Sequence, residues 1–165
     1  MKTIIGVSGR GGSGKTTFCR KQGYHLCVGQ ILREKYGPDY FAKNENPGAP
    51  EELEAEVRSL IEITIMRLPC DATLYIDGFP RNANQVQWIR AYCEAKNHRI
   101  RFIVLTCENQ RRVTRLANRS KPEELDMVAM RELKECKGLF DALVDIVASG
   151  IPVDVVDNSV DEIDE

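Results

Sequence analysis

The sequence has few of the residues that build metal cages and disulfide frameworks. It contains only two histidines, and no two of its six cysteines form a C-x-x-C pair. A tetrahedral zinc site and a network of disulfides are therefore not expected. We expect the cysteines to be reduced thiols that fill the core as small apolar side chains, as is typical of cytosolic proteins.

Long apolar runs and an excess of one charge are also missing. No stretch approaches the roughly 18 apolar residues that a membrane span requires, and the run from Thr3 to Ser8 is too short for the core of a signal peptide. The net charge of −2, from 23 basic and 25 acidic residues, argues against a broad surface for nucleic acid. We expect a cytoplasmic monomer with neither a membrane nor a nucleic-acid partner.

The chain is ordinary in size and composition for one globular domain. It has 165 residues, of which 42% are hydrophobic and 29% charged, and domains usually contain about 100 to 200 residues. Short apolar runs predict strands at 4–7, 25–28, 73–76, 100–105 and 153–156. Helical patterns are predicted between them, at 30–35, 50–68, 86–93 and 125–147, the last preceded by a capping box at 120–123. This alternation is typical of an α/β fold with parallel strands.

A glycine-rich loop follows the first predicted strand. Gly9-x-x-x-x-Gly14-Lys15-Thr16 matches the Walker A pattern, in which backbone N–H groups surround phosphates at a helix N-terminus. The lysine of this pattern reaches the terminal phosphates, and the threonine hydroxyl binds Mg²⁺. The motif predicts an ATP-binding loop made of Gly9, Gly11, Gly12, Ser13, Gly14, Lys15, Thr16 and Thr17.

The phosphate loop by itself leaves a kinase, a GTPase switch and a motor ATPase open. The chain has no Asn-Lys-x-Asp stretch for guanine, which counts against the GTPase, and it is short for a motor. A second motif favours the kinase. Asp77 ends a buried strand, so its carboxylate should reach the same edge of the sheet as the loop, where it could hold a Mg²⁺-bound water. Arg81 lies four residues further on and suits a second anionic group.

At this second motif the chain resembles the adenylate kinase family of nucleoside monophosphate kinases. Leu74-Tyr75-Ile76-Asp77-Gly78-Phe79-Pro80-Arg81-x-x-x-Gln85 follows the family signature at every position, and residues 25–33 resemble the segment leading into the acceptor-binding helix. The likeness spans most of the chain. It implies a P-loop fold with a five-stranded parallel sheet in the order 2-3-1-4-5. It further implies a core of 1–29 and 69–165, an acceptor-binding insertion near 30–68 and a short lid near 119–123.

The resemblance also implies roles for individual residues. Lys15 would neutralise the migrating phosphoryl group, while Thr16 and Asp77 would serve Mg²⁺. The residues of the acceptor nucleotide site would be Gln30, Arg33, Gly78, Phe79, Arg81 and Gln85, with Arg33 and Arg81 on its phosphate and Gln85 on its base. Three later arginines complete the set: Arg115 against the donor base, and Arg119 and Arg131 on the transferring phosphates.

The chain departs from the family pattern at two places. Cys27-Val28-Gly29-Gln30 stands where the family usually has Ser-Thr-Gly-Asp, so the acceptor need not be AMP. The interval between Arg119 and Arg131 is much shorter than usual for a lid. Three hypotheses therefore remain: a nucleoside monophosphate kinase, a P-loop kinase for another phosphorylated or hydroxylated small molecule, and a non-catalytic nucleotide-binding protein.

Overall fold

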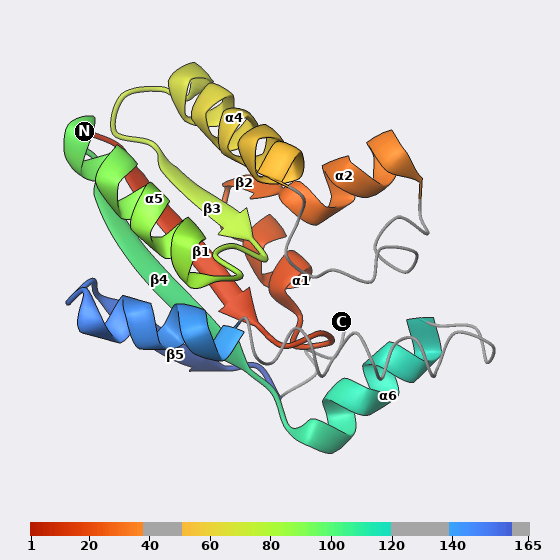
Figure 1. The fold of residues 1–165 in the computed structure, drawn as a ribbon. Helices are drawn as coiled ribbons and strands as arrows, with labels where there is room; N and C mark the ends of the chain where they lie inside the picture. Colours follow the sequence, from red (N-terminus) through yellow and green to blue (C-terminus); the bar gives the residue numbers. More distant parts are fainter. Residues whose placement is uncertain (38–50, 120–138, 160–165) are drawn as a thin grey trace.

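The strands form one parallel sheet in the predicted order. The protein is described here by a computed structural model, which covers residues 1–37, 51–119 and 139–159. Its strands are β1 (Thr3–Gly9), β2 (Tyr24–Cys27), β3 (Thr73–Asp77), β4 (Arg99–Thr106) and β5 (Val153–Asp157). They are arranged β2-β3-β1-β4-β5, and every neighbouring pair is parallel (Figure 1). The predicted fold class and strand order are confirmed.

Helices connect the strands and lie on both sides of the sheet. They are α1 (Lys15–Arg20), α2 (Val28–Tyr36), α4 (Glu51–Arg67), α5 (Ala83–Ala95) and α6 (Asn109–Arg119), and residues 139–148 are also helical. The prediction that Val28 belongs to the second strand is wrong, because β2 ends at Cys27 and Val28 begins α2. Val28 is 8% exposed at the start of α2, and an apolar residue would be expected at the end of a buried strand as well, so its apolar character does not mark the boundary. The predicted capping box at 120–123 lies outside the described residues.

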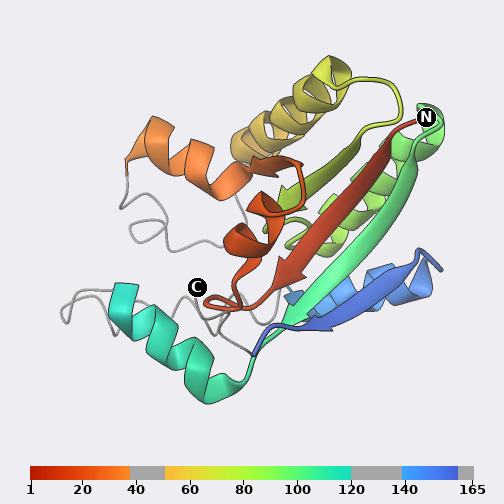
Figure 2. The same ribbon diagram turned by 180° about the vertical axis from the view of Figure 1, so that it is seen from behind.

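Alternate side chains of β1 point to opposite faces of the sheet, and each face has its own core. Ile4 belongs to the larger core, which is completed by α4, α5 and residues 139–148, and which includes Ile61, Ile89 and Ile146. Ile5 belongs to the smaller core on the other face, where α1 contributes Cys19. Figure 2 shows α1 on that second face, with α4 and α5 behind the sheet. This period of two is what a sheet covered on both faces requires.

The carboxyl ends of β1 and β3 lie side by side, which decides where a ligand can be bound. Val7 pairs with Asp77 in the register, and Gly78 N donates to Val7 O across 2.9 Å. Ser8 Oγ donates to Pro80 O, which fastens the turn after β3 to the end of β1. Both sequence motifs begin at these strand ends. They therefore meet at one edge of the sheet, as expected for a doubly wound α/β fold.

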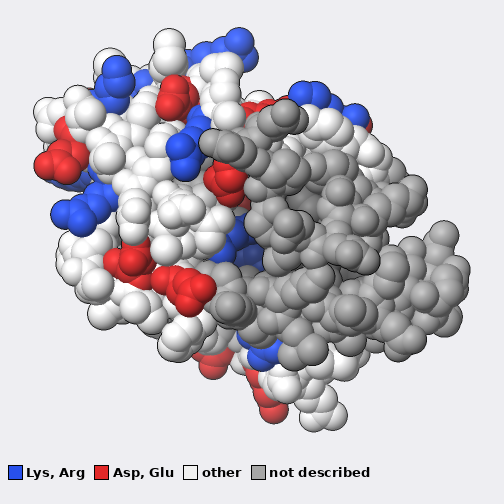
Figure 3. All heavy atoms as spheres, viewed as in Figure 1, with Lys and Arg blue, Asp and Glu red and all other residues white. Residues whose placement is uncertain are grey.

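The surface carries both signs of charge. Basic and acidic side chains are interspersed over the described part of the face in Figure 3, where neither forms a broad field. Among the described residues, no helix is both long and apolar enough to cross a membrane. The cysteines differ in burial. Cys19 and Cys93 are buried, but Cys70 is exposed, so the expectation that all cysteines fill the core is wrong. Cys70 lies in the turn that follows α4, and its side chain is exposed.

Candidate active site

The glycine loop after β1 wraps around a small hollow. The hollow has a volume of about 60 Å³ and is lined by Gly12, Gly14, Lys15, Thr16 and Thr17. The Lys15 ammonium crosses the loop and donates to Gly9 O at 2.8 Å and to Arg10 O at 3.0 Å. Gly14, at the start of α1, has φ 84°, a left-handed conformation that a residue with a side chain rarely adopts. The sequence requirement for glycine here follows from this backbone conformation.

Side chains from α1, β2 and β3 meet next to the loop. Thr16 Oγ1 donates to Asp77 Oδ2 across 2.5 Å, and Cys27 Sγ donates to the same oxygen across 3.1 Å. Burial is the main cause that raises the pKa of the Cys27 thiol above its ordinary value, and the hydrogen bond to Asp77 raises it further. The thiol therefore keeps its proton and acts as a donor. The structure thus brings together Thr16 and Asp77, and adds a thiol that sequence reasoning treated as a core side chain.

The residues of the loop fit a polyphosphate and a magnesium ion. Ser13 Oγ is buried and has no hydrogen-bond partner among the described residues, so a phosphate oxygen would satisfy it. Thr16 and Asp77 present oxygen ligands of the kind that Mg²⁺ prefers. No group of three or more His, Cys, Asp and Glu side chains able to hold a metal occurs in the described part of the chain. A magnesium ion here would therefore depend on phosphate oxygens as well as on the protein.

Two arginines form a second place suited to an anion. A Cβ built on Gly29 would lie 3.4 Å from Arg33 Nη1 and 3.7 Å from Arg81 Nη2, so both guanidinium groups converge over this glycine. Arg81 Nε donates to Gly78 O across 2.8 Å, which holds its side chain against the turn after β3. Guanidinium groups bind phosphate through two parallel N–H bonds, and a pair of them suits a dianion.

Gln85 and Glu54 form a hydrogen-bonded pair between α5 and α4. Gln85 is 5% exposed, its Oε1 accepts from Arg81 N at 2.7 Å, and its Nε2 donates to Glu54 Oε1 at 2.9 Å. Asn82 caps α5 by accepting from Gln85 N, and its own amide donates to Glu54 Oε1. The predicted base-reading amide is therefore oriented by protein groups at both ends. Glu54 Oε2 is buried without a partner among the described residues.

Two other predicted acceptor residues, Phe79 and Gln30, have their side chains engaged elsewhere. Phe79 is 2% exposed and packs edge to face on Trp88, so its side chain belongs to the larger core. Gln30 is exposed on α2, where it accepts from Arg20 and donates to Glu34. Neither side chain joins the place where the two arginines converge.

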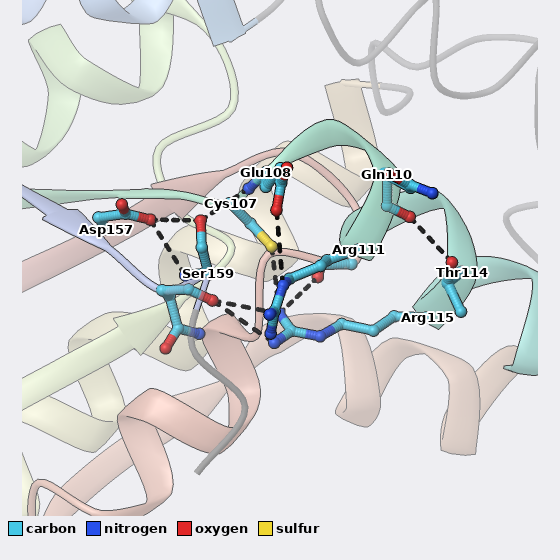
Figure 4. Close-up of polar contacts among 10 residues, drawn as sticks. Cys107, Glu108, Gln110, Arg111, Thr114, Arg115, Asp157 and Ser159 are labelled. Carbon is cyan, nitrogen blue, oxygen red and sulfur yellow. Dashed lines mark hydrogen bonds and ion pairs between the residues drawn. The ribbon is translucent and has the colours of Figure 1, made fainter.

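Helix α6 places arginines behind the loop. Arg115, predicted to lie against the donor base, donates to Gly12 O at 3.3 Å, and it also reaches Cys107 Sγ and Asn158 O. Figure 4 shows its guanidinium pointing from α6 toward the segment after β5. Arg112, which is not among the predicted site residues, is 3% exposed and donates to Gly11 O. The predicted Arg131 and the side chain of Arg119 lie outside the described residues.

Besides Cys27, sequence reasoning missed three residues of this region. Arg112 shares a helical face with Leu116, four residues later, and this spacing could have indicated that it faces the protein. Glu54 lies among several acidic residues at the start of α4, and its contact with α5 has no sequence signal. Asn158 donates to Ser13 O across 2.8 Å, a contact between residues 145 positions apart that no local pattern predicts.

The strand, loop and helix, with Thr16 against Asp77, define the class of protein: this is a P-loop α/β domain, a fold that binds nucleotides through the loop. The chain belongs to the AAA domain family, which matches residues 5–137. It is also distantly similar to the adenylate kinases of two strains of Prochlorococcus marinus, NATL1A and NATL2A. Each is 27% identical over 159 residues, covering 88% of this chain and 85% of the relative. The chain is thus P-loop kinase-like.

Proposed function

We propose that this protein is a nucleoside monophosphate kinase that transfers the γ-phosphoryl group of ATP to a nucleoside monophosphate. The observation that carries the proposal is the pairing of two anion-binding places at one edge of the sheet. The first is the loop hollow lined by Lys15 and Thr16. The second is the convergence of Arg33 and Arg81 over Gly29. Gly29 lies two residues after Cys27, the last residue of β2, which pairs with Asp77 in the sheet. A single anion site would suffice for hydrolysis or for switching, whereas phosphoryl transfer between nucleotides needs two.

The residues supply charge and orientation rather than a strong base. In phosphoryl transfer the negative charge is spread over the equatorial oxygens, while the attacking and leaving oxygens stay in line. Lys15 would neutralise the transferring group, and Arg33 and Arg81 would hold the acceptor phosphate in position. That phosphate is already an anionic nucleophile, so no histidine is needed. Mg²⁺, when bound next to Thr16 and Asp77, would neutralise charge on the donor phosphates.

We assign residues 30–68 to the acceptor-binding insertion and residues 119–123 to a short lid. Both parts would limit access of water to ATP, because hydrolysis competes with transfer in an open site. Arg119 and Arg131 would lie on the transferring phosphates. The proposal for these two arginines rests on the resemblance of the sequence to the adenylate kinase family.

A second candidate is a P-loop kinase for a different phosphorylated small molecule. It is favoured by the state of the predicted base-reading residues, because Gln85 has both ends of its amide bonded to protein groups and Gln30 faces outward. A site of this kind would grip the acceptor by its phosphate and read little of a base.

The experiment that tests both candidates is a phosphoryl-transfer assay with ATP, Mg²⁺ and a panel of acceptors. The panel contains the NMPs, the dNMPs and phosphorylated sugars. Rapid formation of ADP with one nucleoside monophosphate supports the proposal, and turnover confined to a sugar phosphate supports the second candidate. Binding of ATP without any turnover would show a non-catalytic nucleotide-binding protein instead.

Two variants and a control test whether the measured turnover depends on Lys15 and Arg81. Lys15→Ala and Arg81→Ala should each lower turnover by about 10²-fold or more, because each removes a charge that stabilises the transition state. Arg81→Ala should in addition raise the KM of the acceptor, leaving the affinity for ATP unchanged. Arg90→Ala, on the exposed side of α5, is the matched control. Equal rates in all four proteins would contradict the assigned roles.

A further inference from the structure

Three consecutive carbonyl groups of the phosphate loop are bound from behind. Arg112 Nη1 donates to Gly11 O at 3.4 Å, and Arg115 Nη1 donates to Gly12 O at 3.3 Å. Asn158 Nδ2 donates to Ser13 O at 2.8 Å, the shortest of the three contacts. The donors come from α6 and from the segment after β5, both far from the Walker A motif in sequence.

These donors leave no space between themselves and the loop. A Cβ on Gly12 would lie 2.7 Å from the backbone oxygen of Arg112, and a Cβ on Gly14 would lie 2.3 Å from Asn158 Nδ2. Real Cβ atoms do not approach other atoms this closely, so α6 and Asn158 pack directly on the glycines. The glycines thus allow a close approach on the side of the loop that faces α6 and Asn158.

The donors are themselves held in place. Asn158 N donates to Thr106 O across 2.8 Å, and Asn158 O accepts from Arg115. The next residue, Ser159, accepts from Glu108 N and donates to Asp157 Oδ1, so the segment after β5 is tied to the start of α6 (Figure 4). These contacts hold Asn158 and Arg115 in position against the loop.

We infer that Asn158, acting with Arg112 and Arg115, is a positioning residue that orients the amide groups of the loop toward the phosphates of the donor nucleotide. The peptide group is planar and trans, so a carbonyl and the N–H of the next residue point in opposite directions. The carbonyl groups of Gly11 and Ser13 point toward α6 and Asn158. The N–H groups of Gly12 and Gly14 therefore point the opposite way, toward the hollow. Both glycines line the hollow.

The role of Asn158 rests on the proposed binding of ATP as phosphoryl donor, and it does not depend on which acceptor is used. Asn158 is the most informative side chain for a test, because its contact is a single bond from a neutral amide. Asn158→Asp has nearly the same shape but presents no N–H to Ser13 O. Asn158→Ala removes the amide altogether. Asn118→Asp, on the exposed side of α6, is the matched control for the added charge.

The readouts are the affinity for inorganic tripolyphosphate, the KM values for ATP and for the acceptor, and the melting temperature. Tripolyphosphate has no base, so it reports on the loop alone. We expect Asn158→Ala to weaken tripolyphosphate binding about tenfold and Asn158→Asp to weaken it further, because loss of a single orienting bond of this kind costs about one power of ten. The KM for ATP should rise in parallel, while the KM for the acceptor should not change.

Each outcome decides the question. The amide resonances of Gly12 and Gly14 in ¹H–¹⁵N spectra should shift on adding tripolyphosphate to the wild type, and shift less in folded Asn158→Asp. A variant that binds tripolyphosphate as the wild type does overturns the role of Asn158 and leaves the kinase proposal standing. A wild type that binds neither tripolyphosphate nor ATP overturns both. Equal loss of affinity for tripolyphosphate and for the acceptor would indicate general destabilisation and would also overturn the role.

Discussion

Thr16 Oγ1 and Asp77 Oδ2 are 2.5 Å apart, although the two residues are separated by 61 positions in the chain. The contact exists because β3 lies directly beside β1 in the parallel sheet, with Asp77 in register with Val7. The residue that closes the glycine loop and the residue that ends the third strand therefore share one hydrogen bond. This bond joins the two sequence motifs into one site.

Replacing Asp77 by asparagine should weaken the binding of Mg²⁺ without lowering the stability of the fold. The amide oxygen introduced by Asp77→Asn can still accept from Thr16, so the melting temperature should stay close to that of the wild type. The lost charge should raise the Mg²⁺ concentration needed for half-maximal turnover about tenfold or more, because a carboxylate binds Mg²⁺ far better than an amide does. Titration of activity with Mg²⁺ at fixed ATP measures this, and an unchanged midpoint would remove Asp77 from the cation site.

The space above Gly29 should be required for binding of the acceptor but not for folding. In Gly29→Ala, the new methyl group would lie 3.4 Å from Arg33 Nη1 and 3.7 Å from Arg81 Nη2, which is ordinary contact distance. Alanine is also the better helix former. Stability should therefore be equal or slightly higher, while the KM of the acceptor rises about tenfold. Thermal melting and initial rates test this, and loss of ATP affinity instead would contradict it.

The bond between Glu54 and Gln85 should orient the amide that is predicted to read the acceptor base. Glu54→Gln keeps an oxygen that can accept from Gln85, so we expect folding to persist with a changed ratio of kcat/KM among acceptor bases. The exchange variant Glu54→Gln with Gln85→Glu keeps one donor, one acceptor and the net charge, so it should restore stability but not the base preference. Glu94→Gln, at an exposed position of α5, is the control. Identical base preferences in all the variants would leave Glu54 with a structural role only.

Two buried thiols should report on unfolding. Burial raises the pKa of Cys19 and that of Cys93 each to about 12, so neither forms a reactive thiolate at neutral pH. Cys70 is exposed. A maleimide or an aromatic disulfide reagent should therefore modify Cys70 within minutes in the native protein, and Cys19 and Cys93 only in denaturant. Peptide mass mapping after timed labelling checks the order, and early modification of Cys93 would contradict the packing of α5.

The free energy of unfolding should fall as the pH drops through 6.5, the ordinary pKa of histidine. Burial is the largest cause that lowers the pKa of His98 from 6.5, and nearby Lys2 and Lys96 lower it further. The unfolded chain then binds a proton that the folded chain excludes, so the free energy of unfolding decreases as the pH falls through 6.5. Urea unfolding between pH 7.5 and 5 should give a shallower decrease for His98→Gln. Equal slopes would show that His98 is not the group responsible.

The strands and the phosphate loop could be predicted because their signals are local: apolar runs and a glycine motif report on residues that are neighbours in sequence. The order of the strands, which the structure confirms, came instead from the resemblance to the adenylate kinase family. The boundary at Val28 could not be placed, because a buried valine fits the end of a strand and the start of a helix equally well. Cys27 could not be assigned to the site, because its role depends on the neighbouring strand.

The sequence by itself determined the α/β class, the phosphate loop and the pair of motifs, because strand and helix periodicity and glycine conformations are properties of short stretches. Only the tertiary structure decided what lies behind and beside the loop. Arg112 is buried against Gly11, Gln85 is bonded to Glu54, and Asn158 reaches Ser13. Such contacts join segments that are distant in the chain, and their donors and acceptors pair only after the strands have taken their order in the sheet.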